Sequence, residues 1–161
     1  MWQEFAAILN DLNKVYLQLI ELGTKKKKAL VTIDMKTLEG LVKEEDALTK
    51  KIKELEQRRQ KVLIHMAVED RSIKQDTKME DLVRMAPTPQ LQQILVQLHS
   101  SLSKNTAEAK ELSEGNSLLI RGAMQAVAYH LNRIGGATVE PTYGQSGGEV
   151  VSHRKNYEFD A

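Results

Sequence analysis

The longest run of regularly spaced apolar residues lies between Pro89 and Ile134. Its apolar and small residues recur at alternating steps of three and four, which is the spacing of one helix face at the coiled-coil period. The stripe consists of Leu91, Leu95, Leu98, Leu102, Ala109, Leu112, Leu119, Ala123, Ala126, His130 and Ile134, with polar interruptions at Asn105 and Asn116. A helix of this length measures roughly 65 Å, so it needs other helices to cover its apolar face.

Two further helical stripes precede it. The first is predicted over residues 2–32, and its core positions are Trp2, Phe5, Leu9, Leu12, Tyr16, Leu19, Gly23, Lys26, Leu30 and Ile33. Gly23 and Lys26 are poor core residues, so this stripe weakens toward its end. The second is predicted over residues 35–68, with Asp34 as its N-cap and a stripe through Leu38, Leu41, Glu45, Leu48, Ile52, Leu55, Arg59, Val62 and Met66.

A short helix and a break connect the second stripe to the long one. Thr77 and Glu80 have the spacing of a capping box, which predicts a helix over 77–85. The following prolines interrupt the chain, and Thr88 is expected to cap the long helix with Pro89 at its first position. Within that helix, Gly115 marks a weak point where a kink or a close backbone approach is expected.

Residues 135–161 contain Pro141 and five of the nine glycines and show no helical spacing. This composition predicts a flexible C-terminal tail. Tyr143, Tyr157 and Phe159 are three of only seven aromatic residues in the chain. Aromatic side chains favour interfaces, so we interpret the tail as a docking segment; the alternative is that these rings fold back onto the helices.

The predicted fold is therefore all-α. It is an elongated antiparallel helical bundle or coiled coil of three long helices plus a short connecting helix, spanning residues 1–134, with helices at about 2–32, 35–68, 77–85 and 89–134. The composition agrees, because 28% of the 161 residues are charged and only 4% are aromatic.

Candidate chemistry is sparse. The chain has no cysteine, and its four histidines lie at spacings that do not suit a shared metal. Phosphate loops, nucleophile elbows and zinc-protease motifs are absent from the sequence, so we expect neither an enzyme nor a cofactor. Glu4, Asn10 and Asp11 interrupt any signal-like apolar run, no stretch is long enough to span a bilayer, and we expect a cytoplasmic protein without membrane insertion.

Two features admit more than one interpretation. The basic run from Lys25 to Lys28 fits a solvated helix face, or an RNA-binding helical hairpin that contacts phosphates; the net charge of +1 and the lack of aromatics nearby argue against nucleic acid. Asn105 and Asn116 either fix the register of packed helices or mark an open groove for a partner.

Three segments resemble the FlgN-type flagellar export chaperones. The first is Ala29-Leu30, Asp34, Leu38, Leu41, Glu45 and Leu48; the second is Asn116-Ser117-Leu118-Leu119-Ile120; the third is Tyr143-Gly144, then Gly147-Gly148, then Phe159-Asp160-Ala161. Many members of the family have a further Asn where this chain has Ser113.

The resemblance implies a cytoplasmic chaperone of the flagellar type III export system. Such proteins bind the C-terminal helical segment of hook-associated (hook–filament junction) proteins, prevent their premature polymerisation, and contact the export gate and the ATPase machinery. Gate docking in the family involves a tyrosine toward the C-terminus; Tyr143, followed by Gly144, matches best, Tyr129 is the alternative, and Tyr157 and Phe159 belong to the same tail.

An amphipathic client helix can lie along the long helix at the usual i, i+3, i+4, i+7 spacing. The expected contacts are Leu95, Leu98, Leu102, Asn105, Leu112, Asn116, Leu119, Ile120, Met124 and Val127. A structural homodimeric coiled coil without a client is the rival hypothesis, besides the RNA-binding hairpin. Both a monomer and a homo-oligomer are compatible with the sequence.

Overall fold

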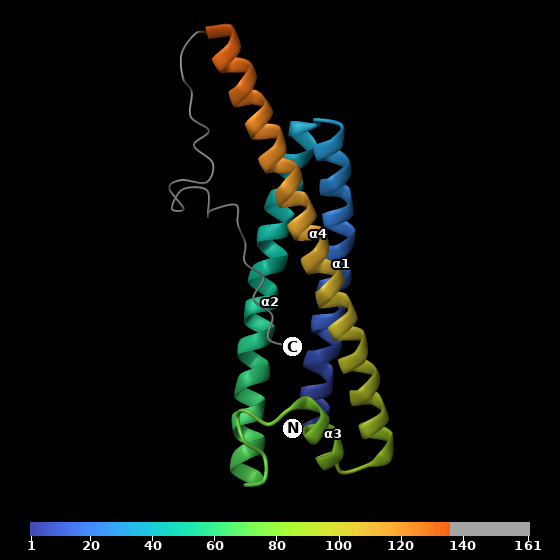
Figure 1. Cartoon of the computed structure of the whole chain (residues 1–161). Coiled ribbons are helices and arrows are strands. Elements are labelled where there is room, and N and C mark those ends of the chain that lie inside the picture. Colours follow the sequence, from blue (N-terminus) through green and yellow to red (C-terminus); the bar gives the residue numbers. More distant parts are fainter. Residues whose placement is uncertain (136–161) are drawn as a thin grey trace.

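The computed structural model describes residues 1–135, which form four helices (Figure 1). They are α1 (Trp2–Val31), α2 (Met35–Glu69), α3 (Met79–Met85) and α4 (Pro89–Gly135). The described residues contain no strand. This confirms the predicted all-α class with three long helices and one short connecting helix.

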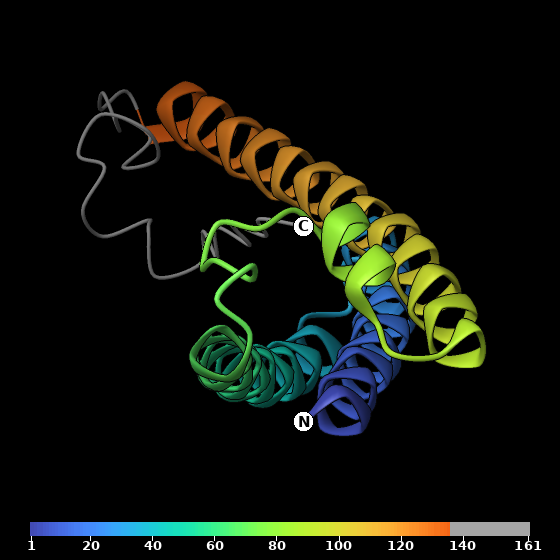
Figure 2. The ribbon, with the colours of Figure 1, turned by 90° about the horizontal axis from the view of Figure 1, so that it is seen from below.

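Helix α1 is the central element of the bundle. It packs against both α2 and α4, whereas α2 and α4 do not pack against each other, and α3 packs on α4 (Figures 1 and 2). Helices α1 and α4 run in the same direction, because Asn13 contacts Leu98 and Asn105 while Gly23 contacts Asn116 further along both helices. Helix α2 runs antiparallel to both.

The burial pattern of α1 follows from its two neighbours. The predicted stripe through Phe5, Leu12 and Tyr16 is buried, and so is a second stripe through Ile8 and Val15. A helix with one neighbour needs only one apolar face, but a helix between two neighbours must bury a wider one. The sequence pattern identified the first stripe except for its last position, since Ile33 lies beyond the end of α1 and is 78% exposed; the structure adds the second stripe.

The two weak positions of the first stripe are explained by their partners on other helices. Gly23 is buried where α4 approaches closely, and a Cβ atom at this position would lie 3.4 Å from Leu112 Cβ. Lys26 Nζ lies 2.7 Å from Glu45 Oε2, and both side chains are largely buried. Two charged residues at core positions therefore pair with each other, which offsets part of the cost of burying them.

The structure shows the N-caps of the three helices for which a cap was predicted. Asp34 caps α2 as expected: Thr37 N–H donates to its carboxylate at 3.1 Å. Leu91 N–H donates to Thr88 Oγ1 at 3.3 Å, so the expected cap of α4 is also present. The predicted capping box at Thr77 is not present. Helix α3 begins at Met79 without a side-chain cap, because Thr77 Oγ1 instead accepts from Lys74 N–H at 2.7 Å.

Candidate functional site

The apolar stripe of α4 divides into two parts with different environments. We call residues 95–116 the proximal stripe and residues 119–134 the distal stripe. In the proximal stripe, Leu95 is 0% exposed and Leu102 is buried in the core shared with α1. Leu98 is half-buried against the same core, and Leu112 lies beside Gly23, 3.4 Å from the position that a Cβ atom there would occupy. These four predicted client contacts pack within the chain.

Both asparagines of the proximal stripe join α4 to α1. Asn105 Nδ2 donates to Asn13 Oδ1 at 3.1 Å, and Asn13 Nδ2 donates to Leu98 O at 3.0 Å. Asn116 Nδ2 donates to Gly23 O at 3.0 Å. Buried amides that pair across two helices fix their register, because a shifted register would leave them unpaired. The geometry therefore supports the register interpretation of both residues.

The distal stripe continues the same face of α4 without comparable cover. Leu119 and Met124 are exposed, Ile120 is half-buried and Val127 is 57% exposed. Beyond these predicted contacts the exposed residues continue to Leu131 and to Ile134, which is 84% exposed; neither was among the predicted contacts, although the same spacing includes them. The described protein thus presents a row of apolar side chains on one helix face.

From Met124 onward, the distal stripe is exposed because α1 ends. The Asn116–Gly23 contact joins residues that are 93 positions apart in the sequence. Carried along both helices, this offset places the end of α1 at Val31 level with Met124. Helix α4 then extends roughly 16 Å beyond that level, at 1.5 Å per residue, and Figure 1 shows this end projecting past the α1–α2 turn.

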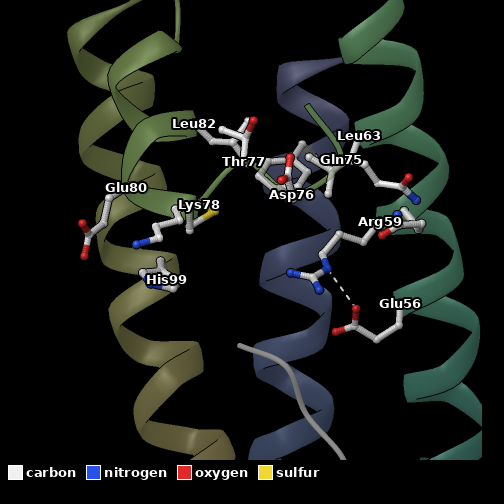
Figure 3. Close-up of a pocket in the computed structure, with 13 residues that line it drawn as sticks. Glu56, Arg59, Leu63, Gln75, Asp76, Thr77, Lys78, Glu80, Leu82 and His99 are labelled. Carbon is white, nitrogen blue, oxygen red and sulfur yellow. Dashed lines mark hydrogen bonds and ion pairs between the residues drawn. The ribbon is translucent and has the colours of Figure 1, made fainter. Parts of the chain in front are cut away.

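A separate cleft of about 830 Å³ lies at the opposite end of the bundle, beside α3 (Figure 3). Its lining combines polar and apolar side chains: Arg59 of α2 points toward Glu56, at 2.8 Å, and His99 of α4 lies on the facing side. No group of three His, Cys, Asp or Glu in residues 1–135 is arranged to hold a metal ion. None of the predicted client contacts lines this cleft.

The basic run from Lys25 to Lys28 does not form one continuous patch. Lys25 pairs with Glu21 at 3.2 Å on the surface, whereas Lys26 points inward to Glu45. Only Lys27 and Lys28 are exposed without an ion pair to a described residue. The run therefore lacks the row of free cations that phosphate contacts along a nucleic acid require.

Four predicted site residues lie outside the described residues: Tyr143, Gly144, Tyr157 and Phe159. The predicted tail was expected to begin at residue 135, which is the last described residue of α4; residues 136–161 lie outside the described residues. Within residues 1–135, no helix has the length and apolar character needed to cross a membrane.

The fold and the distal stripe define an all-α helical bundle in which the longest helix presents exposed apolar side chains beyond the end of α1. The family model described as FlgN protein matches residues 1–150 of the chain. The chain therefore belongs to the FlgN family, which comprises chaperones of flagellar biogenesis rather than enzymes, and which in general binds flagellar hook-associated proteins. No curated protein and no solved structure is significantly similar to the chain.

Proposed function

We propose that this protein is a cytoplasmic export chaperone that binds the C-terminal helical segment of hook-associated proteins through the distal stripe of α4. The contacts are Leu119, Ile120, Met124 and Val127, extended by Leu131 and Ile134. The observation that carries the proposal is the exposure of these side chains on the face that α1 covers upstream. Covering the client helix prevents its self-association by occupancy alone, so no chemical step is needed.

The upstream residues of the predicted contact set have a supporting role in this proposal. Leu95, Leu98, Leu102, Asn105, Leu112 and Asn116 pack or hydrogen-bond within the chain, so a client would reach them only after α1 separated from α4. We infer that they hold α4 on α1 in a fixed register. The distal stripe then projects in one defined orientation.

The first experiment is a calorimetric titration of the full chain with the C-terminal helical segment of each hook-associated protein from the same organism. We expect one-to-one binding with a negative change in heat capacity, because apolar surface is buried on both partners. The absence of binding to every such segment would overturn the proposal.

Two matched variants sharpen the titration. Val127→Asp introduces a charge into the distal stripe and is expected to weaken binding by at least about tenfold, because a buried charge would lack a partner. Leu118→Asp is the control: Leu118 is 64% exposed and lies nine residues away, on the opposite face of α4. Equal losses for both variants would contradict binding through the distal stripe.

The homodimer hypothesis predicts a different result in the same samples. If α4 served to join two copies of this chain, sedimentation without peptide would give the mass of a dimer, and added peptide would not displace it. If the protein is a chaperone with a free face, the chain without peptide should sediment at the mass of a monomer. Added peptide should then bind to it one to one. The mass is compared with the 18.2 kDa of one chain.

Delivery to the export gate and the ATPase machinery is proposed for the C-terminal segment that contains Tyr143, Gly144, Tyr157 and Phe159. We expect Tyr143→Ala to weaken binding to the cytoplasmic domain of the gate while leaving the client titration unchanged. The same substitution at Tyr129 is the comparison, since that tyrosine is the alternative docking residue. A gate affinity that neither substitution alters would contradict docking by these tyrosines.

A further inference from the structure

The turn between α1 and α2 carries a second exposed apolar surface. Val31, Ile33 and Met35 are all exposed, and Ile33 is 78% exposed. We call residues 31–35 the hairpin tip. Turns between helices are normally polar, because their side chains face water. Three large apolar residues within five positions are therefore not explained by the needs of the turn.

The backbone conformation at Ile33 also does not favour an isoleucine at this position. Its φ is 55°, in the left-handed region, and it is the only non-glycine residue of the described chain with a positive φ. Asp34 N–H donates to Ala29 O at 2.9 Å and Ile33 N–H donates to Leu30 O at 3.3 Å, which is the Schellman pattern of a helix C-terminus. Gly or Asn suits this position, whereas a β-branched residue is strained there.

The hairpin tip lies at the level where α4 loses its cover. The offset set by Asn116 and Gly23 places Val31 level with Met124, and Figure 1 shows the distal part of α4 leaving the bundle at the α1–α2 turn. The distal stripe continues the face that packs on α1. It therefore faces the space into which α1 would continue, and the tip forms the end of that space.

We propose that the hairpin tip is a second contact surface for the client helix, which lies on the distal stripe in line with α1 and meets Val31, Ile33 and Met35 at one end. This inference rests on the proposed function, because it assigns a further part of the same site. The fit is that of a helix, since the distal stripe repeats the spacing with which the proximal stripe accepts α1.

The charged residues near the hairpin tip indicate which kind of partner can bind there. Lys27, Lys28 and Lys36 lie within four residues of the tip in the sequence, are exposed, and make no ion pair with a described residue; the tip itself contains one carboxylate, Asp34, so positive charge remains in excess. A second copy of this chain would bring the same lysines against them, which is unfavourable. An apolar helix end flanked by acidic residues is complementary. The client segment is therefore expected to carry Asp or Glu beside its apolar residues where it meets the tip.

The test compares two substitutions at Ile33 in the full chain, with the client segment as the probe. Ile33→Asn suits the left-handed backbone, so the urea midpoint of unfolding should stay equal or rise, while the affinity for the client segment should fall by about tenfold with the lost apolar contact. Ile33→Leu keeps an apolar side chain without the β-branch, so both stability and affinity should be retained. Lys36→Glu should give a smaller loss of affinity that disappears at high salt.

The outcomes separate this inference from the proposed function. If Val127→Asp abolishes binding but Ile33→Asn binds like the unmodified protein, the hairpin tip is not part of the site and the distal stripe remains. If the unmodified protein binds no client segment, both proposals are overturned. Leu17→Asn, at an exposed leucine elsewhere on α1, is the control for a general effect of losing surface leucine or isoleucine.

Discussion

The proximal and distal stripes of α4 have the same residue spacing but opposite environments. Between Leu95 and Asn116 the stripe is buried against α1, and polar residues within it find partners there. Between Leu119 and Ile134 most apolar side chains are exposed, although Ile120 is half-buried and Ala128 is buried. From the level of Met124 onward, the difference arises because α1 ends at Val31 while α4 continues to Gly135.

This comparison separates two uses of one pattern. Helical spacing of apolar residues shows that a face requires cover, and the length of the neighbouring helix decides where the chain supplies it. In the proximal stripe, burial stabilises the fold. In the distal stripe, burial is available to a partner, which is where we place the client.

The largest expected effect is the difference in unfolding free energy between a substitution in the proximal stripe and one in the distal stripe. Leu95→Ala removes a side chain that is fully buried and should lower the free energy of unfolding by about 2–5 kcal/mol, because a cavity is left behind. Val127→Ala should change it by less than about 0.5 kcal/mol, because the side chain is exposed. Urea denaturation followed by circular dichroism measures both. Similar losses for the two variants would mean that the distal stripe is covered within the chain.

An intermediate effect is expected at the last contact of the proximal stripe. Asn116→Asp keeps the shape of the side chain but replaces the amide that donates to Gly23 O with an acceptor. A buried carboxylate facing a carbonyl should cost about 1–3 kcal/mol at neutral pH. The loss should shrink in acid, where the introduced carboxyl is protonated and can donate. Leu118→Asp serves as the exposed control, and an equal loss there would argue against a specific role of the Gly23 contact.

The smallest expected effect is on the pH dependence of stability and involves Asp34, in the turn between α1 and α2. Hydrogen bonds from the Thr37 hydroxyl and the Thr37 N–H lower the pKa of Asp34 below its usual value of 3.8. Its contribution to stability is therefore fully present above pH 3.8 and is lost as the pH falls through the lowered pKa of the folded state. Asp34→Ser keeps a cap without a carboxyl and should flatten this part of the curve of urea midpoint against pH. An unchanged curve would show that the cap does not titrate with folding.

Local signals were sufficient for the helices and most of their ends. The three long stripes gave the long helices, and Asp34 and Thr88 were identified as caps because their side chains act on residues three positions away. Thr77 was misassigned because its hydroxyl accepts from Lys74, upstream, rather than from the following helix. Two competing uses of one hydroxyl cannot be distinguished by spacing alone.

Long-range pairings were not accessible to the same reasoning. Gly23 and Lys26 looked like defects of the first stripe, and only the fold shows Leu112 against the glycine and Glu45 beside the lysine. The prediction of the candidate site was limited for the same reason. Spacing selected residues from Leu95 to Val127 as one set, but it contains no information on where α1 stops covering α4.

The close approach at Gly23 also has a mechanical consequence. Asn116 donates a hydrogen bond to Gly23 O, and α1 continues from there to Val31, level with Met124. The part of α4 beyond that level, to Gly135, is roughly 16 Å long at 1.5 Å per residue. A tilt of about 10° at that level displaces its end by roughly 3 Å. Because a side chain at residue 23 would meet Leu112, we expect a larger residue there to change the tilt of α4 and with it the position of the distal stripe.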